Sequence, residues 1–180
     1  MDDVAVARAR AGDNDGFRQL VEKHSRSVFR LAFRMTGNEQ DAEDIVQETF
    51  LRAYRQLNRY ESRSSFGTWL YRIAANCSLD LIRSRKRSRD HDDAEVLQVM
   101  PAADPGPDRL ALSGEVQQRL TAAMAELSQQ ERTAFVLRHF EGLSIEEISG
   151  MLGVGGNAAK HSIFRAVQKL RKALEPVVTV

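Results

Sequence analysis

Apolar residues at helical spacing are the feature of this sequence that most restricts its fold. Between Phe17 and Met35 they recur every three or four residues, which places them on one face of a helix. Similar patterns predict further helices over about 39–57, 66–87, 116–126, 129–140, 145–151 and 157–174. No segment alternates apolar and polar residues in the manner of a half-buried strand. The sequence therefore predicts an all-α fold.

Local signals mark where these helices begin and end. Gly37 suits the left-handed conformation that closes a helix, and Asn38 is placed to cap the next one. Two later segments match the capping box, Ser128-x-x-Glu131 and Ser144-x-x-Glu147. Residues 58–65 are rich in polar turn formers and lack periodicity, so we expect a loop there.

Charge is distributed unevenly, although the 26 basic and 25 acidic residues of the chain nearly cancel. The net charge is +5 over residues 1–89, −6 over 90–118 and +2 over 119–180. The acidic stretch has no helical period and is rich in proline, as linkers are. We expect two small helical domains, 1–90 and 116–180, joined by a flexible acidic linker at 91–115.

Several classes of protein are disfavoured. The lone Cys77, which falls on an apolar helix face, fits neither a disulfide framework nor a cysteine-rich zinc site. No apolar run approaches the roughly 18 residues that span a bilayer, and the acidic start differs from a signal peptide, so a cytoplasmic protein is expected. The four histidines are scattered and no phosphate-binding glycine loop is present. We therefore expect no catalytic residue, no metal and no cofactor.

The last two predicted helices have the layout of a helix-turn-helix, the second of which enters the major groove of DNA. A short apolar helix over 145–151 is followed by the glycine-rich turn 153–156 and a long basic helix. That helix has no acidic side chain between Ala159 and Leu174, whereas a merely solvated helix usually mixes both signs.

The outward-facing residues of this basic helix are predicted to have two roles. The first turns contact base edges, and later positions contact phosphates. The base-side candidates are Asn157, Lys160, His161 and Phe164, and the phosphate candidates are Arg165, Lys169 and Lys172. An outward phenyl ring can contact a thymine methyl group. The alternative is a solvent-exposed basic helix with Phe164 packed against a neighbour.

A polar ridge marks the predicted helix over 39–57. Asp44, Gln47 and Glu48 lie at i, i+3 and i+4 beside Phe50, which favours a protein interface. Interaction with the helix dipole accounts for Asp41 and Glu43 at the helix start, but not for this ridge.

A basic cluster ends the helix over 66–87. Five of the seven residues 83–89 are basic, and Arg72, Asn76 and Arg83 share one helical stripe. Tyr60, Trp69 and Tyr71 lie nearby in the sequence, and basic groups with aromatic rings suit single-stranded nucleic acid. The alternative is a soluble helix end whose cations favour the dipole, with Trp69 in the core.

These motifs resemble those of a known family. Residues 41–50 and 66–76 are similar to region 2 of bacterial sigma factors of the extracytoplasmic-function (ECF) group of the sigma-70 family. Residues 127–132, 140–148 and 160–173 are similar to its region 4. The motifs occur in the family's order and span nearly the whole chain.

The resemblance implies a sigma factor that joins core RNA polymerase and directs it to promoters. The residues implied to contact the clamp helices of the largest polymerase subunit are Asp44, Gln47, Glu48 and Phe50. Those implied to hold the melted −10 strand, with one base flipped out, are Tyr60, Glu61, Ser62, Arg63, Ser64, Ser65, Arg72, Asn76, Arg83, Arg85, Lys86 and Arg87. The final helix would bind the duplex −35 element and the region around it the polymerase flap, and an anti-sigma factor is implied as a further partner.

One segment departs from the family pattern. Where the family has a Ser- or Thr-bearing turn and a β-branched residue, this chain has Gly155-Gly156-Asn157-Ala158-Ala159, which leaves the −35 sequence open. Two other functions remain as alternatives. A stand-alone helix-turn-helix regulator explains the C-terminal half but not the ridge or the basic cluster, and a small helical enzyme lacks any candidate catalytic set.

Overall fold

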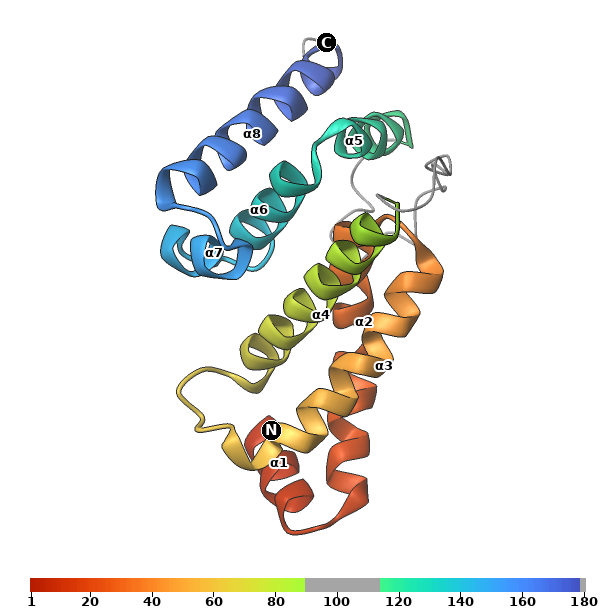
Figure 1. Ribbon diagram of the computed structural model, residues 1–180. Coiled ribbons are helices and arrows are strands. Elements are labelled where there is room, and N and C mark those ends of the chain that lie inside the picture. The colour runs from red at the N-terminus through yellow and green to blue at the C-terminus, as the bar shows by residue number, and fades with distance from the viewer. Residues whose placement is uncertain (90–113, 179–180) are drawn as a thin grey trace. The chain divides into compact units, whose positions relative to one another are not determined.

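Helices make up both parts of the chain that the structure, a computed structural model, describes: residues 1–89 and 114–178 (Figure 1). These residues form two compact units, one on each side of the segment 90–113. No strand occurs within the two ranges, so the predicted all-α fold is confirmed. The predicted linker at 91–115 lies almost wholly outside the described residues.

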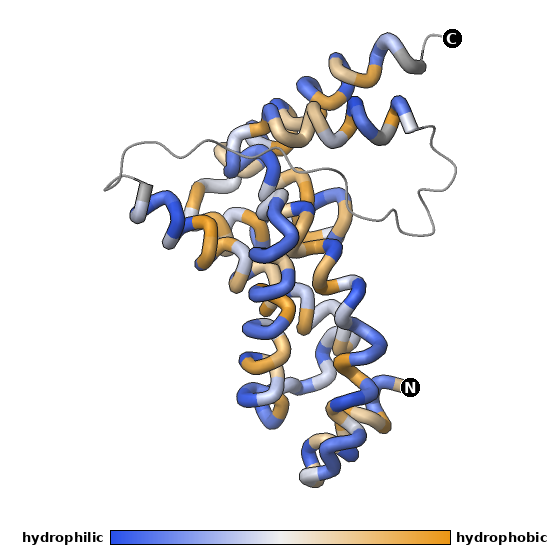
Figure 2. Tube along the Cα trace, turned by 90° about the vertical axis from the view of Figure 1, so that its right-hand side faces the viewer, coloured by the Kyte–Doolittle hydropathy of each residue, from blue (hydrophilic) through white to orange (hydrophobic). Residues whose placement is uncertain are grey.

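The N-terminal unit has four α-helices and one short 3-10 helix. They are α1 (Asp2–Arg10), α2 (Asn14–Thr36), α3 (Glu39–Gln56), η1 (Leu57–Arg59) and α4 (Phe66–Arg89). Helix α2 packs against α1, α3 and α4, and α3 also packs against α4. Hydrophobic and hydrophilic residues alternate along these helices, as amphipathic packing requires (Figure 2).

The apolar stripes expected from the sequence form the core of this unit. Leu20, Leu31 and Met35 of α2 and Leu70 of α4 are almost fully buried. Cys77 is buried with them, where burial raises the pKa of its thiol, so its predicted place in the core is confirmed.

The sequence predicted neither η1, whose residues 58–59 fall in the expected loop, nor helix α1. It buries only small or short side chains, Ala5, Val6 and Ala9, so it has no long apolar stripe to detect. It lies very close to α2 at Gly16, where a Cβ atom would stand 2.7 Å from the carbonyl oxygen of Ala5. The contact therefore depends on glycine at that position.

The predicted boundary between α2 and α3 is confirmed. Gly37 ends α2 in the left-handed conformation, with φ 67°. The side-chain oxygen of Asn38 accepts a hydrogen bond of 2.9 Å from the backbone N–H of Asp41, which caps the start of α3.

The C-terminal unit has four helices. They are α5 (Gly114–Glu126), α6 (Gln129–His139), α7 (Ile145–Leu152) and α8 (Gly156–Val178). Helix α8 packs against each of the other three. Both predicted capping boxes are present, and Gly153 closes α7 with φ 66°, as a helix-turn-helix requires.

Candidate nucleic-acid and protein interfaces

The polar ridge of α3 lies at the surface. Asp44 and Gln47 are exposed, and Glu48 is half-buried. Glu48 accepts a hydrogen bond of 2.6 Å from Nε of Arg52, whose Nη1 donates to Asp80 of α4 at 3.0 Å. The hydrogen bonds from Arg52 to these two carboxylates raise the pKa of its guanidinium. Glu48 is thus held in place, while the other two side chains are available to a partner.

Phe50 does not belong to this surface, in contrast to the expectation. Its side chain is 7% exposed and meets the ring of Phe17 edge-on at 6.3 Å. The exposed apolar residues of α3 are Leu51, at 51%, and Tyr54, at 53%. Leu51 lies seven residues, or about two turns, after Asp44 and therefore on the same side of the helix. That spacing could have identified Leu51 from the sequence as the apolar residue of this surface.

Tyr60 lies beneath the loop 61–65 and does not project from it. The residue is 4% exposed, and its hydroxyl donates a hydrogen bond of 2.7 Å to the carbonyl oxygen of Ser64. Its ring packs against those of Phe66 and Trp69, at 5.7 and 5.1 Å. Both the ring and the hydroxyl therefore help to fix the shape of the loop.

The loop itself is open to solvent. Glu61, Ser62, Arg63 and Ser65 are exposed, and Ser64 is half-buried. Ser62 has a φ of 56°, which is unusual for a residue with a side chain. The Nε atom of Arg63 pairs with Glu61 at 2.7 Å, so the two charged side chains of the loop are joined.

Polar and basic side chains line the outside of α4. Arg72, Asn76 and Arg83 are exposed on the stripe predicted for them, and Lys86 and Arg87 are exposed near its end. Trp69 and Tyr71 are half-buried beside the start of this stripe.

Arg85 differs from its basic neighbours, because it forms an ion pair with Asp41 of α3. The side chain of Asp41 is 3% exposed, whereas that of Arg85 is 49% exposed. Burial raises the pKa of Asp41, although Arg85 opposes that effect. Arg85 therefore neutralises a buried carboxylate and joins the basic end of α4 to the start of α3.

The exposed face of α8 carries the predicted base-side residues. Asn157, Lys160, His161 and Phe164 are all exposed, and Phe164 retains 61% of its surface. The alternative in which Phe164 packs against a neighbour is therefore not observed in the structure. The opposite face is buried through residues that include Ala159, Ser162 and Ala166.

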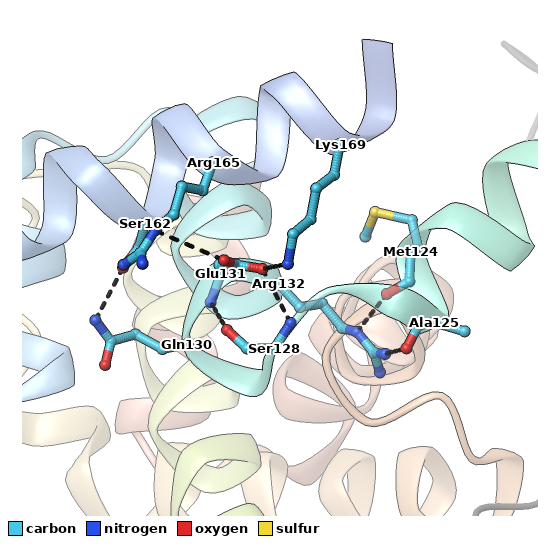
Figure 3. A network of polar contacts seen from close by, with 9 residues as sticks. All are labelled: Met124, Ala125, Ser128, Gln130, Glu131, Arg132, Ser162, Arg165 and Lys169. Atoms are coloured by element: carbon cyan, nitrogen blue, oxygen red, sulfur yellow. Dashed lines mark hydrogen bonds and ion pairs between the residues drawn. The ribbon is translucent and has the colours of Figure 1, made fainter. Parts of the chain in front are cut away.

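Two of the residues predicted to contact phosphates form ion pairs within the protein (Figure 3). Lys169 pairs with Glu131 of α6 at 2.8 Å, and Arg165 approaches the same carboxylate at 3.7 Å. Burial tends to raise the pKa of Glu131, but hydrogen bonds from Lys169 and the Ser128 N–H outweigh it and hold that pKa below its usual value. Lys172 is exposed.

The same network fixes α8 against α6 at a second point. The side-chain amide of Gln130 donates a hydrogen bond of 2.8 Å to the buried hydroxyl of Ser162 (Figure 3). Arg132 donates to the carbonyl oxygens of Met124 and Ala125, at 3.0 and 3.3 Å, and so joins α6 to the end of α5. The exposed face of α8 is therefore presented by a helix held through polar contacts as well as by its apolar core.

Within the ranges 1–89 and 114–178, histidine, cysteine and acidic side chains form no group that could bind a metal. No helix in those ranges is both long and apolar enough to cross a membrane.

Comparison with known families gives two matches. Residues 20–88 match Sigma-70 region 2, and residues 117–170 match Sigma-70 region 4. Together these segments cover more than half of the chain, and they correspond to most of α2–α4 and to most of α5–α8.

Individual proteins agree with the family matches. The chain is 40% identical to the ECF RNA polymerase sigma factor SigE of Mycolicibacterium smegmatis over 156 residues, which is 87% of this chain but 60% of that protein. It is 35% identical to the RNA polymerase sigma-H factor of Pseudomonas aeruginosa, with 98% of this chain and 95% of that one covered. The solved structure of CnrH with the cytosolic domain of CnrY superposes with a TM-score of 0.61 at 27% identity and covers 97% of both chains.

Three observations identify the family: the helical fold, the two family regions in their order, and relatives that align over nearly the full length. The chain belongs to the ECF group of the sigma-70 family of RNA polymerase sigma factors.

Proposed function

We propose that this sigma factor captures a promoter at two points, with residues 116–180 on the duplex −35 element and residues 1–90 on the opened −10 element. The observation that carries the proposal is the presence of one solvent-exposed basic helix face in each family region, on α8 and on α4. Basic faces of this kind supply the phosphate contacts that dominate affinity for nucleic acid.

On the −35 element, Asn157, Lys160, His161 and Phe164 enter the major groove and contact base edges. Asparagine and lysine can hydrogen-bond to purine edges, and the phenyl ring of Phe164 can contact a thymine methyl group. Arg165, Lys169 and Lys172 lie toward the phosphates. The salt bridges of Arg165 and Lys169 with Glu131 orient their side chains and reduce the charge that they offer to DNA.

On the −10 element, the loop residues 61–65 accept a flipped base of the single strand, and Tyr60 supports the loop from below. Arg72, Asn76, Arg83, Lys86 and Arg87 follow the strand along α4. Because it is bound to Asp41, Arg85 contributes mainly by positioning the end of α4. Flipping a base costs a few kcal/mol, which contacts in the loop and along the helix must offset.

The ridge of α3 is the proposed contact with the clamp helices of the largest subunit of core polymerase. Asp44, Gln47 and Glu48 supply polar groups, and the exposed Leu51 and Tyr54 supply apolar surface where Phe50 was expected. Interfaces combine such apolar centres with polar rims. The region around α8 is the proposed contact with the polymerase flap.

A protein inhibitor is also proposed. CnrH, 27% identical to this chain, was solved with the cytosolic domain of a second protein, CnrY. An anti-sigma factor that covers the polymerase-binding surface of α3 is the corresponding partner here. The chain acts in the cytoplasm, where RNA polymerase is, and it performs no catalysis of its own.

Run-off transcription with purified core polymerase on a library of promoter fragments tests the proposal. Adding the chain should produce discrete transcripts that core polymerase alone does not make. The alternative of a stand-alone helix-turn-helix regulator makes a different prediction, namely specific binding of duplex DNA without polymerase. Specific duplex binding by the free chain, together with no stimulation of core polymerase, would establish that alternative.

A further inference from the structure

Helix α1 lies outside the residues that match Sigma-70 region 2, which begin at residue 20, yet it contacts the segment that leads into the loop 61–65. Nε of Arg10 donates a hydrogen bond of 3.1 Å to the carbonyl oxygen of Leu57, and Nη2 donates to the carbonyl oxygen of Tyr60. The guanidinium also lies over the ring of Tyr60, 5.8 Å from its centroid. One side chain therefore fixes the backbone of the last residue before the loop.

The other end of α1 is linked through His24 of α2 to the residues that follow the loop. Asp2 accepts a hydrogen bond of 2.6 Å from Lys23, and its second carboxylate oxygen lies 3.2 Å from Nε2 of His24. His24 is buried, and its ring packs 5.5 Å from that of Phe66, the first residue of α4. A Cβ atom on Gly67 would lie 3.3 Å from the same imidazole.

Helix α1 is itself fixed in place. Its backbone at Ala5 and Ala9 is too close to Gly16 for any side chain at that position. Asp13 caps α2 by accepting a hydrogen bond from the backbone of Asp15, and Arg8 pairs with Asp13 at 2.7 Å. Moving α1 would therefore break its contacts with α2, the helix at the centre of the unit, and would cost free energy.

We propose that α1 braces the loop 61–65, directly before the loop through Arg10 and indirectly after it through His24, and that Arg10 is a positioning residue for capture of the −10 strand. This inference rests on the proposed −10 role of the loop. Arg10 donates its hydrogen bonds to backbone carbonyls and acts on DNA only through the loop. A loop held in its binding conformation loses less conformational entropy when it accepts a base, so affinity rises without any new contact to DNA.

The test uses holoenzyme assembled from core polymerase and the full chain, with a fluorescent single strand that carries the −10 sequence of a promoter found by run-off selection. Substituting Arg10→Gln should weaken binding of this strand about tenfold, because a charged donor to two carbonyls is lost. Arg18→Gln is the matched control: Arg18 is exposed on α2 and pairs with Asp15 and Glu22 of its own helix, so strand affinity should stay within about twofold.

Three further measurements separate positioning from general damage to the fold. Arg10→Gln should leave core affinity and −35 duplex binding at their wild-type values. It should also reduce discrimination among the four bases at the position that the loop captures. Arg10→Lys should restore part of the affinity, because one ammonium can still donate to a carbonyl, and Asp2→Asn should weaken strand binding from the other end of α1.

The outcomes distinguish this inference from the proposed function. If wild-type holoenzyme binds the strand no better than core polymerase alone, the −10 role itself is wrong. If the wild type binds the strand and Arg10→Gln binds it equally well with unchanged base discrimination, only the brace is overturned. A uniform loss of core affinity, −35 binding and strand binding in Arg10→Gln would also overturn it, because Arg10 would then serve folding alone.

Discussion

The ammonium of Lys169 lies 2.8 Å from a carboxylate oxygen of Glu131, 38 residues earlier in the chain. Glu131 is also the third residue of α6 and the carboxylate member of its capping box, where it accepts a hydrogen bond from the backbone of Ser128 at 3.1 Å. One nearly buried carboxylate therefore caps α6 and holds α8, the helix proposed to enter the major groove. This contact helps to hold the exposed face of α8 in its orientation.

Replacing that carboxylate with an amide of the same shape should destabilise the C-terminal unit. Glu131→Gln keeps an acceptor for the cap but removes the charge that Lys169 contacts, so we expect a loss of about 1 kcal/mol in the free energy of unfolding at pH 7. Since the pKa of Glu131 is lowered by folding, its stabilisation is present above the unfolded value of about 4.3 and disappears as pH falls through the folded value. Chemical denaturation at pH 7 and at pH 3 measures both effects, and equal stability of the variant and the wild type at pH 7 would contradict them.

The pair between Arg85 and Asp41 should behave differently from the rest of the basic cluster. Arg85→Ala leaves a buried carboxylate without its cation and should lower stability by about 1–2 kcal/mol, a range reduced because Arg85 is half-exposed. Arg87→Ala, the control, should change stability by less than about 0.5 kcal/mol. The double variant Asp41→Asn/Arg85→Ala should recover part of the stability lost in Arg85→Ala. If the stability losses of the two single variants simply add in the double variant, the two residues do not stabilise the fold as a pair.

The raised pKa of Asp41 also predicts the sign of a pH effect. The folded state holds this proton more tightly than the unfolded state, so the contribution of Asp41 to stability declines as pH rises from about 3.9 through its folded pKa. Asp41→Asn should remove that decline. Unfolding free energies measured between pH 3 and pH 7 test this, with the wild type as reference.

Removing charge from the exposed end of α4 should impair promoter opening. With Arg83, Lys86 and Arg87 all changed to Gln, we expect open-complex formation to fall at least about tenfold at physiological salt, because contacts to phosphates are lost. Core affinity should not change. Arg18→Gln, which removes an exposed charge from α2, is the charge control, and permanganate footprinting of the −10 region is the readout. An unchanged footprint in the triple variant would exclude a role for these residues in strand binding.

Two neighbouring positions on α3 should separate folding from polymerase binding. Phe50→Ala should destabilise the chain by about 3 kcal/mol or more, because a buried ring is lost from the core. Leu51→Ser should leave stability nearly unchanged but weaken core binding about fivefold, because Leu51 is half-exposed on the proposed interface. Thermal melts and fluorescence titration with core polymerase measure the two quantities. Equal core affinity for Leu51→Ser and wild type would remove Leu51 from the interface.

Phe164 should be sensitive to single methyl groups in the −35 element. Replacing thymine with uracil, one position at a time, removes only the C5-methyl group, and we expect one such change to weaken binding about threefold to fivefold. Phe164→Ala should abolish this sensitivity while retaining weaker binding overall. Uracil outside the −35 element is the control. If no position responds in the wild type, Phe164 does not contact a thymine methyl group.

The sequence alone determined the local structure of most of the chain. Periodic apolar residues predicted seven of the helices, and Gly37, Asn38 and both capping boxes marked ends that the structure confirms. These features could be predicted from the sequence because helices are stabilised by contacts between residues three or four positions apart. The exposed positions of α8 could be predicted for the same reason, because the residues on one face of a helix follow from their spacing.

Contacts between distant residues were decided only by the tertiary structure. Phe50 was expected at a surface because it stands beside a polar ridge, but Phe17 of another helix covers it. Arg85 and Lys169 were predicted to contact DNA, and the structure shows that Asp41 and Glu131, 44 and 38 residues away, bind them within the protein. Helix α1 has almost no apolar stripe of its own and is held by backbone packing at Gly16 and by the hydrogen bonds of Arg10. Sequence spacing specifies the face of a helix, but it carries no information about which distant residue comes to cover that face.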